Sequence, residues 1–260
     1  RVLFRSVQIT TTFMGLIDFD TTKQKINVGL WMSLRWNDPR LVWDETNPER
    51  HKLFGGVKRL TLEPETVWKP DLTLYDGVDQ EQARIDRDDQ VKLQVSPNGD
   101  ILWIPLLFTE VACPMTSKYF PFDVQLCYLK WGGWVDDMQT MNLTLYKNQQ
   151  EASTTYMTDN QIFKVVKTKQ LINTIIYEDS GYGFQDLKLF LWLSRNYNGF
   201  ILTILTNSLF LCFICLLSFL IPVASGERLS LSLSVVIAIT VYQLIATDML
   251  PIGTDTQPCL

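Results

Sequence analysis

The pattern of hydrophobic and polar positions divides the chain into a long first part and a short second part. Over the first 195 residues, apolar and polar positions alternate in short runs, as in β-strands that bury one face. Residues 91–95 alternate in this way, a turn containing Pro, Asn and Gly follows at 96–100, and residues 101–104 resume, which predicts a β-hairpin. Many short strands separated by turns predict an antiparallel sandwich. Further strand candidates lie at 27–36, 142–146, 163–166 and 187–193.

The second part of the chain is strongly apolar. No Asp, Glu, Lys or Arg occurs between Arg195 and Glu227, and residues 200–223 are dense in Leu, Ile and Phe. Residues 229–247 form another uncharged stretch of similar length. Because a helix of about 20 apolar residues crosses a bilayer, these segments predict a hairpin of two membrane helices. The alternative is a pair of buried helices in a soluble protein, which seldom need such long uncharged runs.

The second apolar segment carries an ordered polar stripe. Steps of three or four residues from Glu227 lead to two serines, three apolar residues and finally Asp248, all on one helical face. A stripe that begins and ends in carboxylates suits a wall facing water, and several copies around an axis would enclose a pore. A helix–helix packing face with interhelical serine hydrogen bonds is the alternative, and spacing alone leaves both open. The stripe consists of Glu227, Ser230, Ser234, Ile237, Val241, Leu244 and Asp248.

Composition narrows the function. The chain has 23 Lys and Arg against 28 Asp and Glu, a net charge of −5, which argues against nucleic-acid binding. A single histidine, His51, excludes a His-rich metal site. Acid pairs such as Asp136 and Asp137 resemble glycosidase carboxylates, but no nucleophile motif or phosphate-binding loop accompanies them. We therefore expect neither an enzyme nor a cofactor.

Two features favour an exterior location for the first part. Cys113 and Cys127 are its only cysteines, and in an oxidising compartment they would pair and close a loop of about 15 residues, worth about 3 kcal/mol in the chain-entropy model. Asn142, followed by Leu143 and Thr144, forms the one glycosylation sequon. A membrane-anchored adhesion module would explain a sandwich, a disulfide and an anchor. It would not explain the second apolar span with its acid-ended stripe.

The segment from Cys113 to Cys127 resembles the signature loop of the Cys-loop receptors, the pentameric ligand-gated ion channels. It has thirteen residues between the two cysteines and contains Phe120-Pro121-Phe122-Asp123. Residues 36–44, 68–75 and 129–134 are similar to the family's ligand-binding loops D, A and B. Residues 225–230 and 248–251 match the two ends of its pore-lining helix. The resemblance covers nearly the whole chain and is closest to the nicotinic acetylcholine receptor-like, cation-selective branch.

The resemblance implies two domains in a pentamer. Residues 1–195 would form an extracellular ligand-binding sandwich, immunoglobulin-like and mainly β, with about ten strands. Residues 196–260 would form an all-α transmembrane region with only the first two helices present, at about 198–223 and 227–249, and a loop at 250–260. Since the family has four such helices, we expect the chain to be part of a longer subunit. The implied partners are four further subunits, a small amine or amphiphilic ligand, monovalent cations and the lipid bilayer of the plasma membrane.

The resemblance also places a ligand site between neighbouring sandwiches. Aromatic faces attract a cation by about 0.5–2 kcal/mol each, and Trp does so most strongly, so Trp134 is the expected central contact. Trp43 and Trp68 are expected in the core instead. The loop with Glu178 and Asp179 lacks the adjacent cysteines of nicotinic α-type subunits, so the agonist stays open, as does a subunit that binds none within a heteropentamer. The principal face would comprise Tyr75, Trp134, Tyr177 and Tyr182, and the complementary face Trp36, Leu102 and Ile104.

The resemblance also implies which residues control ion permeation and which couple the ligand site to the pore. Rings of Glu227 and Asp248 would attract cations at the two mouths of the pore, and Ile237 with Val241 would form an apolar constriction. Arg195 is either an anchor at the membrane edge or the partner of an acid in a coupling loop. The expected coupling residues are Phe120, Pro121, Phe122, Asp123, Arg195 and Pro258, together with the turn around Asp20.

Overall fold

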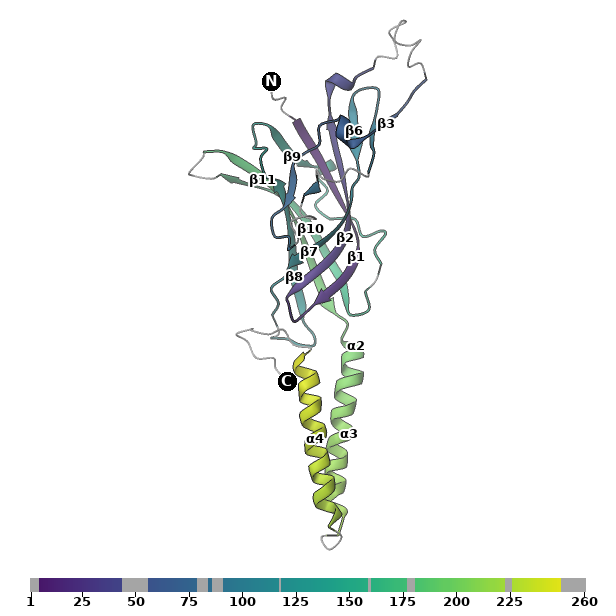
Figure 1. The fold of residues 1–260 in the computed structure, drawn as a ribbon, viewed down its shortest axis with the longest axis vertical. Coiled ribbons are helices and arrows are strands. Elements are labelled where there is room, and N and C mark those ends of the chain that lie inside the picture. The colour runs from purple at the N-terminus through teal and green to yellow at the C-terminus, as the bar shows by residue number, and fades with distance from the viewer. Residues whose placement is uncertain are drawn as a thin grey trace.

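The computed structural model describes residues 5–43, 56–78, 84–85, 91–116, 118–158, 160–176, 181–222 and 226–248. A β-sandwich forms one end of the molecule, and two long helical segments project side by side from its base (Figure 1). The described residues form eleven strands, which confirms the predicted sandwich followed by helices. Tyr177 and Pro258 lie outside the described residues, as do Glu178 and Asp179.

The larger sheet is built around the β1–β2 hairpin. Its strands follow the order β3-β5-β6-β2-β1-β9, and β7 also pairs with β2. Strand β9 runs parallel to β1, while the other pairings are antiparallel. The strands are β1 (Arg5–Asp20), β2 (Lys25–Asn37), β3 (Leu60–Leu62), β5 (Leu93–Val95), β6 (Asp100–Trp103), β7 (Leu106–Ala112) and β9 (Met141–Leu145).

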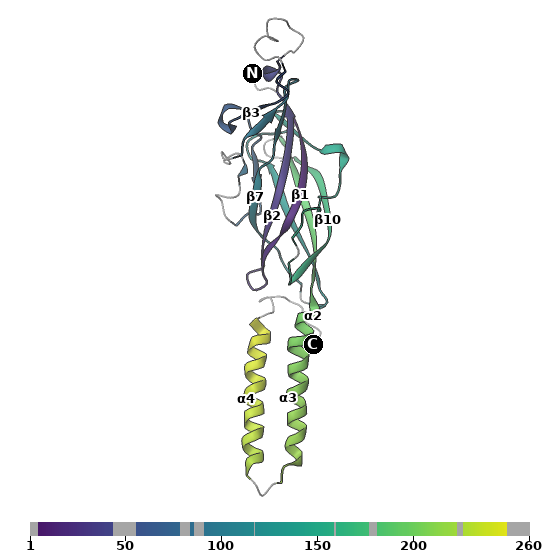
Figure 2. The same cartoon turned by 90° about the vertical axis from the view of Figure 1, so that its right-hand side faces the viewer.

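The smaller sheet carries the segments nearest to the expected ligand site. Its order is β10-β11-β8-β4, with all neighbours antiparallel. Strand β10 is an edge strand, and in the rotated view it lies on the opposite side of the sandwich from β7 (Figure 2). The strands are β4 (Leu72–Leu74), β8 (Val124–Gly133), β10 (Phe163–Ile176) and β11 (Gly183–Arg195).

Alternation along the strands creates the core between the sheets. In β2, Val28, Leu30, Met32 and Leu34 are fully buried, while the intervening positions point outward. The predicted hairpin is confirmed, because β5 pairs with β6 through a turn in which Gly99 has a φ of +80°. A side chain at this position would be strained by that φ and would collide with the carbonyl oxygen of Asp38.

A disulfide joins the loop before β8 to that strand. Cys113 and Cys127 are bonded and buried, as expected. Their link fixes the loop that contains Phe120 and Asp123 against the end of the sandwich from which the helices project.

The helical region begins directly after β11. It comprises α2 (Tyr197–Phe200), a π-helical turn (Ile201–Leu205), α3 (Thr206–Leu217), a short 3-10 turn (Ser218–Leu220) and α4 (Glu227–Asp248). Within the described part, Glu227–Ile245 is long and apolar enough to span a membrane, and Thr206–Leu220 is apolar but shorter.

Asp38 follows directly after β2 and forms an ion pair with Arg5, the first residue of β1. Its carboxylate is 1% exposed and accepts hydrogen bonds from Arg40 Nε at 2.9 Å and Nη2 at 2.6 Å, while Arg5 lies 3.5 Å away. The Arg40 guanidinium lowers the pKa of Asp38 from 3.8 to about 2, although burial opposes this shift.

An acid titration should reveal this ion pair. Because the folded pKa lies below the ordinary value, the carboxylate contributes stability that is fully present above about pH 4 and lost as the pH falls towards 2. We expect Asp38→Asn to lower the thermal midpoint at pH 6 and to flatten its dependence on pH between 5 and 2. The control is Asp100→Asn at an exposed position. Equal acid profiles for the Asp38 variant and the parent would contradict the assignment.

Candidate functional site

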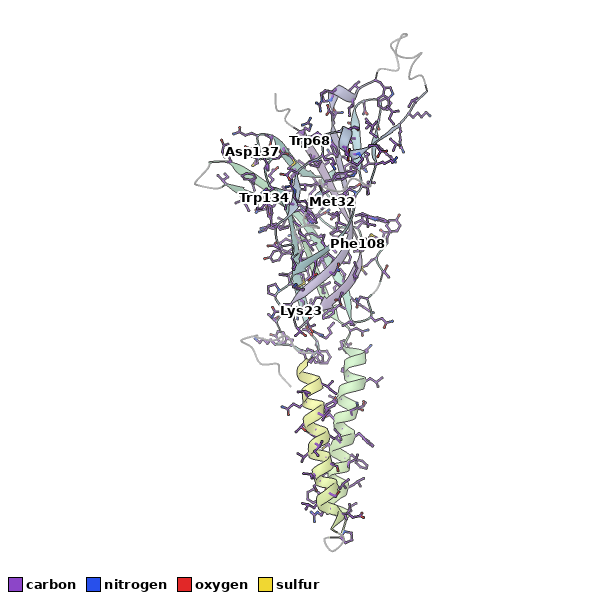
Figure 3. All side chains as sticks on the ribbon, in the orientation of Figure 1. Lys23, Met32, Trp68, Phe108, Trp134 and Asp137 are labelled. Atoms are coloured by element: carbon purple, nitrogen blue, oxygen red, sulfur yellow. A yellow bond between two sulfur atoms is a disulfide. The ribbon has the colours of Figure 1, made fainter. Side chains whose placement is uncertain are left out.

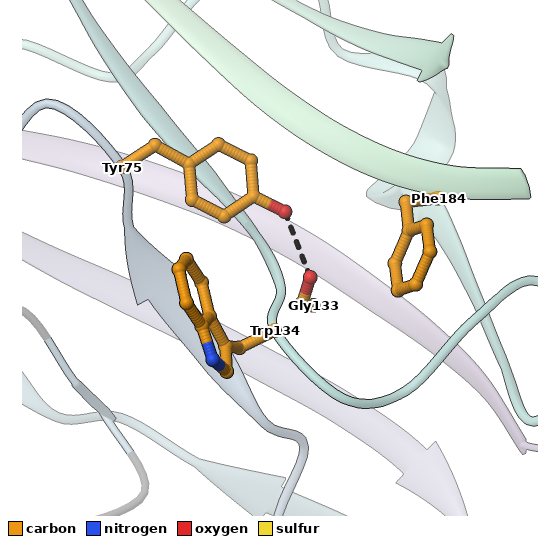
Figure 4. Close-up of a pocket in the computed structure, with 4 residues that line it drawn as sticks. All are labelled: Tyr75, Gly133, Trp134 and Phe184. Atoms are coloured by element: carbon orange, nitrogen blue, oxygen red, sulfur yellow. Dashed lines mark hydrogen bonds between the residues drawn. The ribbon is translucent and has the colours of Figure 1, made fainter. Parts of the chain in front are cut away.

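Two of the expected aromatic residues meet at one side of the sandwich. Tyr75, Gly133, Trp134 and Phe184 line a cavity of about 390 Å³ (Figure 4). The rings of Tyr75 and Trp134 lie edge to face, 6.3 Å apart, and Trp134 is 64% exposed. Tyr182 is half exposed near the same end of β11. An exposed indole beside a phenol and a phenyl ring can receive a cation on its face.

The backbone of Gly132 and Gly133 in β8 determines the position of the Tyr75 ring. Its hydroxyl donates a hydrogen bond of 2.8 Å to the carbonyl oxygen of Gly133 (Figure 4). The ring lies so close to Gly132 that an added Cβ there would collide with the phenol. Gly132 therefore allows Tyr75 to reach across β8 to the cavity wall.

Asp71 holds the turn that presents Trp134. One carboxylate oxygen accepts hydrogen bonds from the backbone nitrogens of Trp134 at 3.2 Å and Val135 at 2.7 Å. The other oxygen pairs with Arg84 at 3.1 Å. Since the carboxylate comes from the segment before β4, the geometry ties two loops that are distant in sequence.

Removing this carboxylate should loosen the indole. We expect Asp71→Ala to weaken agonist sensitivity about tenfold, because charge-assisted hydrogen bonds contribute about 1.5–3 kcal/mol and only part of that loss reaches the ligand. Concentration–response curves of the full-length receptor would measure the effect. Glu63→Ala, which removes the exposed pair with Lys92, is the control and should leave the curve unchanged. Identical curves for both variants would show that Asp71 does not position Trp134.

The neighbouring acids belong to the same turn. Asp137 accepts hydrogen bonds from the backbone nitrogens of Gln139 and Thr140, both at 3.1 Å, so it caps the turn. Burial and then the nearby Asp71 carboxylate raise the pKa of Asp136. These contacts give Asp137 a structural role in the turn.

Sequence reasoning missed two residues of this site. Phe184 lines the cavity from β11, two residues after the predicted Tyr182. Asp186 follows on the same face of β11, opposite Gly132. Its carboxylate is 1% exposed, and neither oxygen has a hydrogen-bond partner among the described residues. Strand alternation through 182, 184 and 186 would have drawn attention to both.

The expected complementary residues lie elsewhere on the chain. Leu102 is half-buried and Ile104 is 42% exposed, but Trp36 is only 3% exposed and packs edge-on against Trp68 at 5.9 Å. Trp36 borders a cavity of about 610 Å³ together with Arg35, Leu102 and others, although most of the residue is buried, and its place on the complementary face stays a prediction.

The alternation of β2 explains the burial of Trp36. Trp36 has the same parity as the buried Leu34, whereas Trp31 lies on the outward face beside Tyr156, with ring centroids 5.6 Å apart. Within one chain the principal and complementary sets line different cavities.

Arg195 forms a buried ion pair at the base of the sandwich. Its Nε and Nη2 donate to the two carboxylate oxygens of Asp123 at 2.8 and 3.1 Å, and Gln125 donates to Asp123 at 2.5 Å. The guanidinium also lies 5.0 Å from the ring of Phe120 and 4.6 Å from that of Phe163. Of the two roles expected for Arg195, the structure contains the pair with a loop acid.

The other expected coupling residues surround this pair. Pro121 is half-buried, while Phe122 is 61% exposed and its ring lies 5.0 Å from that of Tyr197 at the start of α2. In the turn after β1, Asp20 accepts a hydrogen bond from the backbone nitrogen of Lys23, which lowers its pKa. Lys23 marks this turn at the helical end of the sandwich (Figure 3).

The stripe on α4 is exposed along its described side chains, while Val235 on another face of the helix is buried. Ser234 donates its hydroxyl to the carbonyl oxygen of Ser230 at 2.9 Å. Ile237, Val241 and Leu244 are 56%, 53% and 65% exposed. Asp248 is the last residue of α4. The structure thus leaves the stripe free for contact outside the chain.

Asn142, the first residue of the glycosylation sequon, is half-buried on β9 and borders a cavity between β9 and β10.

Comparison with known proteins identifies the class. Residues 5–197 match the model of the neurotransmitter-gated ion-channel ligand-binding domain, so the chain belongs to this family. More specifically, it is a Cys-loop receptor subunit of the nicotinic type, and its relatives are receptor subunits and not enzymes.

Three relatives illustrate the similarity. Acetylcholine receptor subunit beta-like 1 of Drosophila melanogaster is 27% identical over 248 residues, which cover 94% of this chain and 45% of the relative. Neuronal acetylcholine receptor subunit alpha-3 of Rattus norvegicus is 26% identical over 94% of this chain and 47% of its own length. Subunit beta-3 of Homo sapiens is 27% identical over 94% and 51%. The chain therefore spans about half the length of the curated relatives it matches.

Proposed function

We propose that the complete subunit forms a pentameric channel in which an amine, bound between neighbouring sandwiches, opens a cation-selective pore. The exposed indole of Trp134, set against Tyr75 and Phe184, carries the proposal, because such rings bind a cation by their faces. Asp186 lies opposite Gly132 in the sheet, one residue from Gly133 in the cavity wall. The sandwich would lie outside the cell, and the apolar helices would cross the plasma membrane.

The ligand class follows from the same surface. The cavity is open and mainly aromatic, so it favours a small amine or a larger amphiphile with a charged nitrogen. The missing adjacent cysteines in the loop before β11 distinguish this principal face from nicotinic α-type subunits. Trp36, Leu102 and Ile104 of the next subunit would complete the enclosure, since Trp36 and Leu102 line a second cavity on β2 and β6.

Expression of the full-length subunit in oocytes tests the proposal. A panel of primary, tertiary and quaternary amines is applied, and sodium and chloride are replaced in turn. We expect an amine-evoked current whose reversal potential follows sodium. Currents that appear only with a nicotinic α-type partner, and are insensitive to Trp134 substitution, would instead support the role of a subunit without an agonist site of its own.

The pore part of the proposal rests on the α4 stripe. Glu227 is exposed at the first position of the helix, and five copies around an axis would concentrate cations at one mouth. Arg228 lies at the same level on another face, where its guanidinium is 5.2 Å from the ring of Phe219.

Substitutions of Glu227 and Arg228 should show which face of α4 determines ion selectivity. We expect Glu227→Ala to move the reversal potential towards chloride and to reduce the cation-to-anion permeability ratio severalfold. Arg228→Ala changes the charge by the same amount but should have the smaller effect, because its side chain packs on Phe219 in the 3-10 turn after α3. Reversal potentials under ion substitution measure both. An unchanged potential in Glu227→Ala would remove this residue from selectivity.

A further inference from the structure

The outward face of the smaller sheet concentrates positive charge in an acidic protein. Strands β8, β10 and β11 contain six basic residues and one acid, Asp186, which is buried. The whole chain has the opposite balance, with 28 acidic and 23 basic residues. The charge of Arg195 is neutralised by its ion pair with Asp123. We call the remaining set the basic face: Lys130, Lys164, Lys167, Lys169 and Lys188.

Strand register places these lysines around a column of aromatic rings. Lys167 is opposite Trp192, and Lys169 is opposite Phe190, which is in turn opposite Tyr128. The ring centroids of Trp192 and Phe190 are 6.2 Å apart, and those of Phe190 and Tyr128 are 6.3 Å apart. The ammonium of Lys167 lies 5.5 Å from the Trp192 ring, and Tyr128 is 41% exposed. Partly exposed rings therefore lie between cations on the outward face of this sheet.

Protection of a sheet edge accounts for only part of this arrangement. Lysines on an edge strand discourage pairing with other chains, which suits Lys164, Lys167 and Lys169 on β10. Lys188 and Lys130, however, lie directly opposite each other on the two interior strands β11 and β8. Like charges in this position are destabilising, so edge protection does not explain them.

The lysines of the basic face also form no ion pairs with the described acids around them, including Asp186, which lies two residues from Lys188 on β11. In the part of the chain that the structure describes, none of the five forms an ion pair. By contrast, Lys23, Lys25 and Lys92 all pair with a neighbouring acid. The positive potential of the basic face is therefore directed outward, where it attracts an anionic partner.

We propose that the basic face binds a linear sulfated polysaccharide of the cell exterior. Repeated sulfate and carboxylate groups along such a chain match lysines spread over three strands, and the flat faces of its sugar rings suit the partly exposed aromatic column. Clusters of basic residues are the usual footprint for heparin-like polymers. The proposal requires the sandwich to lie outside the cell, but it does not depend on the ligand site or the pore.

The geometry disfavours a membrane surface as the occupant. Lys188 precedes Arg195, the last residue of β11 before α2, by seven positions, or about 23 Å of extended strand. Headgroups at the helical end would reach Lys164 but not Lys188 and Lys130. A polymer lying along the strands contacts all rows of the basic face at once.

Heparin binding of the purified full-length receptor in nanodiscs tests the proposal. The triple variant Lys164→Gln, Lys167→Gln, Lys169→Gln should bind immobilised heparin on the order of tenfold to hundredfold more weakly at physiological salt, since three cations near a polyanion are removed. The matched control is Lys58→Gln, Lys92→Gln, Lys147→Gln, which removes the same charge elsewhere. Amine-evoked currents should be retained in both variants and report correct folding. Absence of heparin binding in the parent, or equal losses in both triple variants, would overturn the proposal.

A second comparison distinguishes a polysaccharide from other anions. Phe190→Thr combined with Tyr128→Thr keeps every charge, favours strand structure and removes two rings of the column. We expect weaker heparin binding with an unchanged salt dependence, because only the sugar contacts are lost. Heparin binding equal to that of the parent, full competition by polyglutamate, or stronger binding to phosphatidylserine vesicles than to heparin would each overturn the polysaccharide assignment.

Discussion

Replacing Arg195 with methionine should destabilise the receptor by about 3–5 kcal/mol and abolish channel opening, because it leaves a buried carboxylate without its partner. The side chains of Arg195 and Asp123 are 9% and 3% exposed, and two hydrogen bonds join them. The cation also stacks on Phe120 and Phe163, so methionine loses ring contacts as well as charge. Thermal inactivation of agonist binding and agonist-evoked current would measure the two effects.

A matched exposed pair provides the control for this result. Lys23 and Asp20 lie 3.3 Å apart with side chains 73% and 31% exposed, so Lys23→Met should cost far less stability than Arg195→Met. The double variant Arg195→Met, Asp123→Leu should recover much of the stability, since no charge stays buried, but not the current. Recovery of the current in the double variant would show that the pair is structural and takes no part in coupling.

The same pair predicts a change with pH. Burial tends to raise the pKa of Asp123, but hydrogen bonds from Arg195 and Gln125 outweigh it and lower the pKa below its ordinary value. The carboxylate therefore contributes stability that is present at neutral pH and lost as the pH falls through the lowered pKa. In Arg195→Met the contributions that lower this pKa are reduced while that of burial remains, so the acid-dependent loss of stability from Asp123 should be smaller than in the parent.

Replacing Trp134 with alanine should reduce amine sensitivity by about 30-fold or more, since a cation on a partly desolvated indole face contributes about 2 kcal/mol. The side chain is 64% exposed, so folding should be little affected. Trp134→Phe should give an intermediate loss, because phenyl offers a weaker negative face. Concentration–response curves for the full-length receptor would rank the three side chains.

The control for Trp134 uses another tryptophan of the same sheet. Trp192 lies on the outward face of β11, away from the cavity, and Trp192→Phe should leave amine sensitivity unchanged. Equal sensitivity of the parent, Trp134→Phe and Trp134→Ala would mean that the amine does not contact this ring. The proposed site between sandwiches would then be incorrect, although family membership would stand.

The sequence predicted local elements well wherever the alternation was regular. The hairpin of β5 and β6 and the strands β2, β9 and β11 were expected from short alternating runs. Strand β10 is much longer than the predicted 163–166, because its bulge between Val165 and Lys167 interrupts the alternation. The same regularity, applied consistently, would have placed Trp36 in the core and Trp31 on the outward face.

Linear sequence by itself determined the class of fold, the disulfide between Cys113 and Cys127, and the apolar segments with their acid-ended stripe, since these depend on period, spacing and length. Only the tertiary structure decided that Asp71 holds the Trp134 turn, that Asp123 pairs with Arg195, and that Asp186 lies opposite Gly132. These partners lie between 54 and 72 residues apart in the chain, as with Asp123 and Arg195 at a separation of 72. Strand register brings such residues together, and register is set by the packing of both sheets at once, which no local pattern records.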